Sequence, residues 1–422
     1  MKKPNFEGYV CLKNDYSHTS RGIQLNQVLS LQLLQLSFKL ITPDKATRKT
    51  AARLLNKTLN VSPFVNAFEK SKVVSSYINQ RKDYQELADS YFAKCKEHTA
   101  VHLPSLVYKR KVSYVNIIKA FSFVFLKKHS GSANEKFYLA CYLVYYLNLL
   151  DTLTEAFKNT DLRGKKYAPF NSSFDLETLF TLFFKHKGAD TYHTSHGLSY
   201  VNFKGDTNID GVNGENITAA NLLVWGETSR TDLINNYNHD PGAITVAGNP
   251  KYPAKLMSVK QTFKKGIVFL GGPVYDKDNA ELITLTGRIA TRNNIEFSVK
   301  AHPFSNLKHF SSIALASDVA LLPNDKTITE TLRSGDYDFA IAYNTTSYYE
   351  AMYYNMVCFR YAVNESGDYK GLDDKFYDQE SFDKQLDRYK NIKSSVLNES
   401  VQQVLVDNLG MGINKYEYIF NN

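Results

Sequence analysis

From about Lys165 onward, short apolar runs of strand length alternate with longer segments of amphipathic helical pattern. Such alternation is typical of a parallel sheet, because parallel neighbours can be joined only by a long crossover, usually a helix. The runs GIVFL (266–270) and DFAIAY (338–343) have the length of buried strands, and NAELITLTGRIATRNN (279–294) has that of a crossover helix. The pattern therefore predicts an α/β fold with parallel strands.

The first 160 residues have a different pattern. Leucines recur at helical spacings from Ser20 to Ile41, and no Gly-rich loop or clear strand is visible in this part. The most apolar run, Phe137 to Leu150, is shorter than the ~20 residues that a membrane-spanning helix needs. We therefore expect a buried helix here, within a largely helical N-terminal region.

The length of 422 residues suits two domains better than one core. A connector is expected between Tyr252 and Phe263, where a proline interrupts the α/β pattern. The predicted parts are a helical N-terminal region (1–160), the remainder of a first α/β domain (161–255), a second α/β domain (256–380) and C-terminal helices (381–422) that could pack back on the first domain.

Composition narrows the classes of protein that fit. Hydrophobic content of 43% with 22% charged residues is that of a globular protein. The four cysteines are scattered, which argues against a disulfide framework or a structural zinc site and favours a reducing compartment. No apolar segment follows the basic N-terminus as in a secretion signal, so a cytoplasmic location is expected.

The net charge is +9, with Lys and Arg dense between Lys45 and Lys128. A solvated helical face explains such a region in the simplest way. Attraction to anionic lipid headgroups or to an anionic acceptor polymer are the functional alternatives. No nucleic-acid-binding motif accompanies the charge, so no nucleic acid partner is expected.

Polar residues and glycines follow the predicted strands at their carboxyl ends, where open α/β sheets bind their ligands. His302, in Lys300-Ala301-His302-Pro303, can donate a hydrogen bond to a phosphate oxygen, and Pro303 stiffens the turn. Gly271 and Gly272 follow GIVFL and allow backbone amides to approach a ligand closely. Each pattern is also common in ordinary loops, so neither identifies a site by itself.

Consecutive hydroxyl residues follow the run DFAIAY. Thr345, Thr346 and Ser347, after Asn344, are ordinary N-cap residues for the next predicted helix. The same hydroxyls, with free backbone N–H groups at the positive end of a helix, also suit a phosphate group. Glu350 lies one turn into that helix, where it could reach ribose hydroxyls or serve as a first-turn acid.

A histidine also ends a predicted strand earlier in the chain. His196 lies in the Ser-His-Gly segment that closes DTYHTSHG, and His193 lies on the same run. An imidazole at a strand end can act as a general base on an acceptor hydroxyl. A lone histidine is usually structural, so this interpretation depends on the order of the other motifs.

That order resembles bacterial cell-surface polysaccharide glycosyltransferases of the GT-B fold. Ser-His-Gly, a Gly-Gly strand end, Lys-Ala-His-Pro and Thr-Thr-Ser follow one another between roughly Lys165 and Tyr361. The chain looks like bacterial sialyltransferases and capsule polymerases with His-Pro and paired Ser/Thr motifs, and more distantly like CDP-glycerol glycerophosphotransferases. The resemblance implies two Rossmann-like domains facing a cleft, with the acceptor on the side of residues 1–160 and a nucleotide donor on 256–380.

The resemblance also implies roles for individual residues. His302 would contact the donor phosphate and assist departure of the nucleotide, while Glu350 would lie near the ribose. Thr-Thr-Ser in place of Ser-Ser is a departure from the family pattern. The implied donor-binding residues are Gly271, Gly272, Lys300, His302, Pro303, Asn344, Thr345, Thr346, Ser347 and Glu350.

The catalytic base has several candidates. His196 matches the His-Gly histidine of the polyol-phosphate polymerases, whereas sialyltransferases use an acid in a D/E-D/E-G motif that this chain lacks. Asp175, Asp206 and Asp210 are the nearest acids. The implied catalytic candidates are therefore His196, His302, Asp206 and Asp210. Asp336-Tyr337-Asp338 matches D-x-D in letters but opens a strand at the wrong end, so no metal and no cofactor are expected.

The implied function is inverting, metal-independent transfer of a sialic acid or hexose from a nucleotide-sugar to a capsule, lipooligosaccharide or O-antigen glycan. The expected partners are this donor and a glycan or glycolipid acceptor, with peripheral contact to the inner membrane surface as an option. A polyol-phosphate transferase is an alternative that the lack of an obvious membrane-binding helix with Trp anchors disfavours. A nucleotide-sugar epimerase and a non-catalytic carbohydrate-binding protein are alternatives of other classes. The sequence does not identify the donor, acceptor or linkage.

Overall fold

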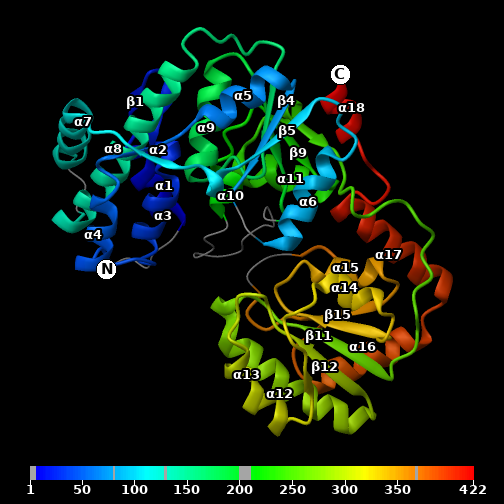
Figure 1. Ribbon diagram of the computed structural model, residues 1–422. Coiled ribbons are helices and arrows are strands. Elements are labelled where there is room, and N and C mark those ends of the chain that lie inside the picture. The colour runs from blue at the N-terminus through cyan, green and yellow to red at the C-terminus, as the bar shows by residue number, and fades with distance from the viewer. Residues whose placement is uncertain (1–5, 79–80, 128–130, 199–210, 366–368) are drawn as a thin grey trace. The chain divides into compact units, whose positions relative to one another are not determined.

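The computed structural model describes residues 6–78, 81–127, 131–198, 211–365 and 369–422. The chain divides into two compact units, each with its own six-stranded sheet (Figure 1). Unit 1 comprises Met1–Val224, Ser229–Ala247 and Asn414–Asn422, and unit 2 comprises Trp225–Thr228 and Gly248–Ile413. The units therefore interleave in sequence, and the last residues of the chain belong to the first unit.

The sheet of unit 1 is parallel throughout, in the order β10-β9-β8-β7-β4-β5. The strands are β4 (Val73–Tyr77), β5 (His98–His102), β7 (Lys166–Pro169), β8 (Asp190–Thr194), β9 (Asn221–Val224) and β10 (Ile244–Val246). Counted along the chain, the order is that of a flavodoxin-like sheet with one added strand, which places the topological switch point between β4 and β7.

Helices enclose this sheet and supply much of its core. Phe64 packs on Phe180 with tilted rings whose centroids are 4.5 Å apart, and Tyr167 of β7 meets Phe184 edge-on at 4.7 Å. The helices that follow or precede the strands are α5 (Ser62–Lys70), α6 (Lys82–Phe92), α9 (Asp175–His186), α10 (Gly211–Glu215), α11 (Glu227–Tyr237) and α18 (Tyr416–Asn421). Aromatic packing between α5, α9 and β7 thus holds the middle of unit 1 together.

The N-terminal region is largely helical, as expected for residues 1–160, but it also contains strands that the sequence did not reveal. β4 and β5 lie inside it and belong to the sheet, and β3 (Lys57–Leu59) pairs antiparallel with β6 (Tyr108–Arg110). The sequence did not reveal β4 because its central residues Ser75 and Ser76 are polar. The Ser75 hydroxyl bonds His98 Nε2 at 2.8 Å and the Ser76 hydroxyl bonds the Tyr167 hydroxyl at 2.6 Å, so both serines have hydrogen-bond partners inside the fold.

The remaining elements of this region form a helical layer beside the sheet. They are α1 (Phe6–Asp15), the hairpin β1 (Thr19–Ser20) and β2 (Ile23–Gln24), α2 (Leu25–Val28), α3 (Ser30–Ser37), α4 (Lys45–Ala52), the turn η1 (Leu103–Ser105), α7 (Tyr114–Leu126) and α8 (Ala133–Ala156). The apolar run predicted as a buried helix lies in α8 and is mostly buried, as expected. Among the described residues, no helix is both long and apolar enough to cross a membrane.

Unit 2 has a second parallel sheet, in the order β13-β12-β11-β14-β15-β16. Its strands are β11 (Lys265–Phe269), β12 (Glu296–Lys300), β13 (Ala320–Leu321), β14 (Phe339–Ala342), β15 (Val357–Tyr361) and β16 (Lys375–Phe376). Counted along the chain this is the 3-2-1-4-5-6 order of the Rossmann fold, with its switch point between β11 and β14.

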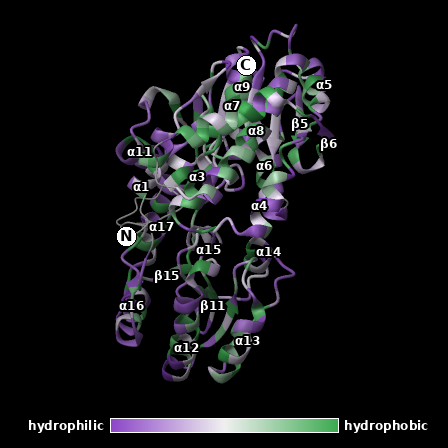
Figure 2. Cartoon of the chain, turned by 90° about the vertical axis from the view of Figure 1, so that its left-hand side faces the viewer, coloured by the Kyte–Doolittle hydropathy of each residue, from purple (hydrophilic) through white to green (hydrophobic). Residues whose placement is uncertain are grey.

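The crossovers of unit 2 are helical, as the alternating pattern predicts. They are η3 (Pro273–Tyr275), α12 (Asp276–Asn293), α13 (Leu307–Ala316), α14 (Ile328–Arg333) and α15 (Ser347–Tyr353), while α16 (Gln379–Asn391) and α17 (Ser394–Leu409) follow the last strand. The short turn η2 (Pro241–Ala243) lies in unit 1 and leads into β10. Figure 2 shows the ribbon of α16 as mostly hydrophilic, whereas hydrophobic residues gather around α7 and α8. Two Rossmann-like units in one chain confirm the predicted α/β fold class. A GT-B fold likewise consists of two such domains.

The helices at the C-terminal end of the described chain are divided between the two units. Residues 381–413 stay with unit 2, whereas α18 packs in unit 1, where Tyr416 stacks on Tyr91 at 4.5 Å and Phe420 lies 4.9 Å from Phe92. Only the last short helix thus returns to the first unit.

Candidate functional site

The switch point of unit 2 brings the three sequence motifs to one edge of its sheet. Phe269, the last residue of β11, is in register with Lys300 of β12 and Ala342 of β14. The segments that follow these three residues therefore leave the same edge side by side, and hydrogen bonds of 3.1 Å from Leu270 N to Lys300 O and from Tyr343 N to Phe269 O tie them together. Open α/β sheets bind ligands at this position.

The Gly271-Gly272 loop is held from below by Asn279, the fourth residue of α12. The Asn279 side chain accepts from Gly271 N at 3.0 Å and donates to Gly271 O at 3.1 Å. A Cβ on Gly271 would lie 3.0 Å from both Tyr275 and Tyr343 O, whereas a Cβ on Gly272 would meet nothing within 4 Å. A side chain at position 271 would therefore crowd Tyr275 and Tyr343, which explains the glycine there. At Gly272 no side chain covers the backbone, so a ligand can approach its amide closely.

The Lys300-His302 segment carries two basic side chains, of which Lys300 is buried and His302 is partly exposed. Lys300 is buried, its ammonium donates to Pro323 O at 2.8 Å, and burial lowers its pKa. His302 is partly exposed, and its Nδ1 lies 3.2 Å from Phe304 N, which donates to it. Because Nδ1 accepts this bond, Nε2 carries the proton when the ring is neutral. Lys300 fixes the neighbouring loop, while His302 is the better placed for a ligand.

The hydroxyl segment follows β14 through a left-handed residue, Asn344, with φ of 45°. The hydroxyls of Thr345 and Ser347 are 2.9 Å apart, and Ser347 N donates to Thr345 Oγ1 at 3.3 Å. Thr346 is the N-cap of α15, and its side chain makes no capping bond. Because α15 has only seven residues, its dipole is small. Any attraction of this segment for an anion therefore comes mainly from the hydroxyls and the adjacent backbone N–H groups.

Glu350 and the Tyr343 ring complete the surroundings of this edge. Thr329 donates to the Glu350 carboxylate at 3.4 Å. The Tyr343 hydroxyl donates to Asp278 at 2.7 Å, which also accepts from Asn364 at 3.2 Å. Asp278 and Tyr343 were not found from the sequence, since their hydrogen bonds join residues 65 and 86 positions apart. Asn279 lies only eight positions from Gly271 but follows no motif.

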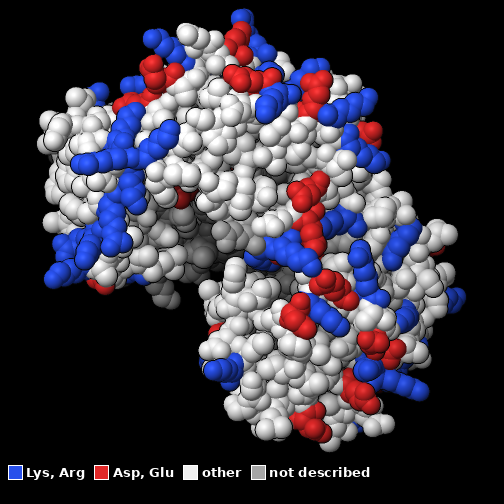
Figure 3. Space-filling model, viewed as in Figure 1, with Lys and Arg blue, Asp and Glu red and all other residues white. Residues whose placement is uncertain are grey.

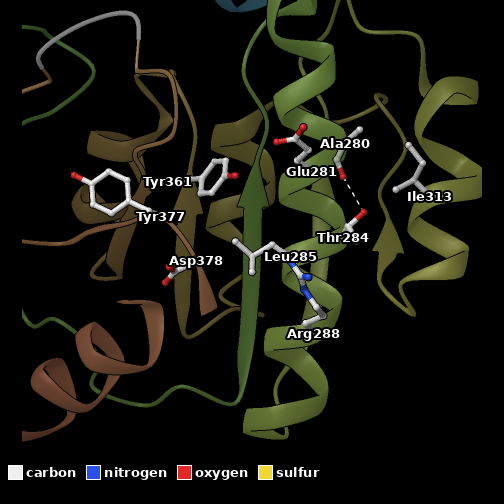
Figure 4. Close-up of a pocket in the computed structure, with 9 residues that line it drawn as sticks. All are labelled: Ala280, Glu281, Thr284, Leu285, Arg288, Ile313, Tyr361, Tyr377 and Asp378. Atoms are coloured by element: carbon white, nitrogen blue, oxygen red, sulfur yellow. Dashed lines mark hydrogen bonds between the residues drawn. The ribbon is translucent and has the colours of Figure 1, made fainter. Parts of the chain in front are cut away.

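A groove in unit 2 lies along α12 and is separate from this edge. Figure 4 shows it between α12, which contributes Glu281, Leu285 and Arg288, and the side chains of Tyr361 and Tyr377. None of the predicted donor-binding residues lines it. The groove is therefore no part of the candidate site.

In unit 1, His196 lies just beyond β8 among aromatic rings. Its ring centroid is 5.9 Å from Tyr84 and 5.8 Å from Phe170, and the Arg81 guanidinium covers the Tyr84 ring at 4.0 Å. Burial, with a smaller effect of Arg81, lowers the pKa of His196 to about 4. Arg81 and Tyr84, near the switch point after β4, were missed because β4 itself was not recognised.

The other base candidates are either engaged in hydrogen bonds inside unit 1 or lie outside the residues that the structure describes. His193 is fully buried, bonds Ser172 at 3.0 Å, and has a pKa lowered to about 3 by burial, so it is structural. Asp175 is partly buried and accepts from the Tyr146 hydroxyl, and desolvation of the carboxylate raises its pKa. Asp206 and Asp210 lie outside the described residues.

The D-x-D letters lie at the amino end of the sheet, as predicted. Asp338 immediately precedes β14 and accepts from Lys264 N at 2.9 Å and Thr262 at 2.9 Å, so it caps a strand start. Within the described ranges, no three His, Cys, Asp or Glu side chains form a group that could hold a metal ion.

Comparisons with protein-family models and with curated proteins find no match. Similar solved structures include a Staphylococcus aureus TarM mutant in complex with Fondaparinux, alpha-GlcNAc-glycerol and UDP, at 17% identity and a TM-score of 0.43 over 65% of this chain and 59% of TarM. Another is UDP-GlcNAc 2-epimerase from Methanocaldococcus jannaschii, at 11% identity and a TM-score of 0.46 over 82% of this chain and 98% of the epimerase. The pneumococcal O-GlcNAc transferase GtfA, in complex with UDP and GlcNAc, is similar at 10% identity and a TM-score of 0.35 over 61% of this chain and 53% of GtfA. This chain thus spans less than two thirds of TarM, and its fold is established by its own strand order.

Proposed function

We propose that this chain is a GT-B glycosyltransferase that binds a nucleotide-sugar at the carboxyl edge of the unit 2 sheet. One observation carries the proposal: β12, β11 and β14 end in register at the switch point, and each is followed there by a segment suited to a phosphate. A partly exposed imidazole, bare glycine backbone and a row of hydroxyls all provide donors and no negative charge.

In this proposal the donor phosphate lies between His302 and the hydroxyls of Thr345, Thr346 and Ser347. His302 Nε2 donates to a phosphate oxygen, and the amides around Gly272 approach the phosphate closely. Glu350, at the next turn, accepts from ribose hydroxyls. Lys300, Pro303 and Asn344 shape the loops rather than contact the ligand, because Lys300 is buried and bonded to Pro323 O.

The reaction is a single displacement with inversion. The acceptor oxygen bonds the donor carbon, the bond from that carbon to the phosphate oxygen breaks, and the electron pair leaves with the nucleotide. The proton of the acceptor hydroxyl passes to a base of unit 1. His196 is neutral at pH 7, as a base must be, but a pKa near 4 makes it a weak one. Asp206 and Asp210 therefore remain base candidates beside it.

The finer identity of the reaction is also proposed. A capsule, lipooligosaccharide or O-antigen glycan is the proposed acceptor, and a sialic acid or hexose is the proposed sugar. The motif order supports this choice, since His-Pro and paired hydroxyl segments follow one another as in bacterial sialyltransferases and capsule polymerases. Transfer is proposed to need no metal, so activity should persist in excess EDTA.

Donor binding is tested by thermal shift with CMP-, UDP-, GDP- and CDP-linked donors. One nucleotide class should stabilise the protein by ~2.7 kcal/mol at one hundred times its dissociation constant. His302→Ala should abolish the shift, whereas His309→Ala, which removes an exposed histidine of α13 in the same unit, should keep it. An unchanged shift in His302→Ala would contradict the assigned site.

Turnover is tested by mass spectrometry of the donor sugar with and without glycan acceptors. We expect an acceptor-linked product, lost in His196→Ala while donor binding is retained. Full turnover in His196→Ala would assign the base to Asp206 or Asp210. Conversion of the donor sugar into an isomer without any acceptor would overturn transfer in favour of an epimerase.

A further inference from the structure

Helix α7 is apolar on the face that it exposes. Successive residues of a helix are 100° apart, which places Tyr114, Val115, Ile118, Phe125 and Leu126 within an arc of about 120°. These five side chains are 77, 60, 66, 44 and 82% exposed. Ser122 lies in the same arc and is exposed, so one hydroxyl interrupts this apolar face. A water-facing helix normally carries charged and polar residues on its outer face, so the outer face of α7 is unusually apolar.

The opposite face of α7 already anchors the helix. Ala120 and Val124 are fully buried, and Phe121 meets Phe137 of α8 edge-on at 5.8 Å. Asn116 donates to Asn148 of α8 at 3.0 Å and to Asp151 at 2.9 Å. The exposed face is thus not needed to hold α7 in place, and changes there should leave the fold intact.

Basic residues surround the exposed face. Lys109 and Arg110 of β6 and Lys119 of α7 are exposed, and Lys127 lies over the Phe123 ring at 4.7 Å. The sequence contains no Asp or Glu between Glu97 and Glu135. Figure 3 shows Lys and Arg gathered on the side of unit 1 that bears α4, α7 and α8 in Figure 1.

The carboxylate that contacts α7 does not offset this charge at the surface. Asp151 bonds Asn116 on the buried side and pairs with Arg21 at 2.6 Å. Tyr108 of β6 is half exposed beside this face, with the Lys57 ammonium over its ring at 4.7 Å. The α7 patch, defined as Tyr108, Tyr114, Val115, Ile118, Phe125 and Leu126, is therefore an apolar surface with a positive rim.

We propose that the α7 patch docks unit 1 on an anionic lipid bilayer. The aliphatic and Phe side chains enter the boundary of the acyl chains, Tyr rings lie at headgroup level with their hydroxyls in water, and the Lys and Arg rim pairs with lipid phosphates. A second copy of the chain fits less well, because a two-fold contact through this patch would bring the same positive rims together. The α7 patch shares no residue with the donor site, so vesicle binding should not depend on nucleotide binding.

Binding of the full-length protein to vesicles tests the proposal, without any nucleotide. We expect sedimentation with vesicles of phosphatidylglycerol and phosphatidylcholine, weak binding to phosphatidylcholine alone, and loss of binding in high salt. Ile118→Glu with Leu126→Glu should abolish binding. Lys109→Glu with Arg110→Glu should weaken it by at least about 25-fold, from roughly fivefold per basic residue near the surface.

Matched changes elsewhere serve as controls. Leu315→Glu alters an 83% exposed leucine of α13 and Lys277→Glu an exposed lysine of α12, and both should bind as the unchanged protein does. Unchanged binding in the Ile118→Glu, Leu126→Glu protein would overturn the proposal, as would no binding to anionic vesicles. A concentration-dependent dimer that this double variant dissolves, without vesicle binding, would assign the patch to a second copy instead.

Discussion

A buried ion pair in unit 2 allows a quantitative test of the structure. Arg360 of β15 donates from Nε to Asp374 Oδ1 at 2.5 Å, and the side chains are 8 and 0% exposed. The Tyr348 hydroxyl of α15 also donates to Asp374, and the guanidinium donates to Tyr369 O and Leu372 O. The pair therefore joins β15, the segment before β16 and the helix that follows the hydroxyl motif.

Asp374→Ala should cost about 3–5 kcal/mol, because it leaves the Arg360 charge buried without a counter-charge. The pKa of Asp374 is raised to about 6, since burial outweighs the attraction of Arg360. The pair is thus costly to bury even when intact, and Arg360→Met with Asp374→Leu should recover most of the loss. A domain of 150–250 residues loses about 2–4 °C of Tm per kcal/mol, so the single change should lower the Tm of unit 2 by about 6–20 °C.

Tryptophan fluorescence during urea unfolding is the assay, because the sole tryptophan, Trp225, is buried in unit 2 and reports on that unit. Asp373→Ala is the matched control, because Asp373 is the neighbour of Asp374 in sequence but is exposed and pairs with Arg388 at the surface. Its loss should lower the free energy of unfolding by at most about 1 kcal/mol. A loss below about 1 kcal/mol in Asp374→Ala would refute the account of the pair.

Two further predictions concern pH and the glycine loop. Burial lowers the pKa of His98 to about 4, so the unfolded chain binds its proton first, and stability should fall by up to ~3 kcal/mol as the pH drops from about 6.5 to 4. Urea unfolding at several pH values checks this; an equal drop in His98→Gln would contradict the assignment. Gly271→Ala should weaken nucleotide binding at least tenfold, because its Cβ would press on Tyr343 O, whereas Gly272→Ala has open space and should fold normally. Calorimetric titration with the stabilising nucleotide measures the first, and equal affinity in Gly271→Ala would exclude a role for this loop.

Strands β11 and β14 could be predicted because GIVFL and DFAIAY are apolar runs of strand length. Strands β15 and β16 were not predicted, since Arg360 interrupts the apolar run of β15 and β16 has only two residues. β5 could not be predicted, since His98 and Thr99 look like loop residues until their bonds to Ser75 at 2.8 Å and Ser71 at 2.6 Å are known. Periodicity likewise predicts an apolar helix at α7, but it cannot show that apolar side chains such as Tyr114, Ile118 and Leu126 are exposed. The Arg81, Tyr84 and His196 cluster depends on the pairing order of strands, which no local pattern encodes.

The path of the chain has a consequence for biosynthesis. Unit 1 receives its final element, α18, only after all of unit 2 has been translated. Until then Tyr91 and Phe92 lack the rings of Tyr416 and Phe420, so a nascent first unit shows an aromatic surface to chaperones and proteases. Completion of unit 1 therefore waits for the synthesis of unit 2, although all strands of the first sheet come earlier in the chain.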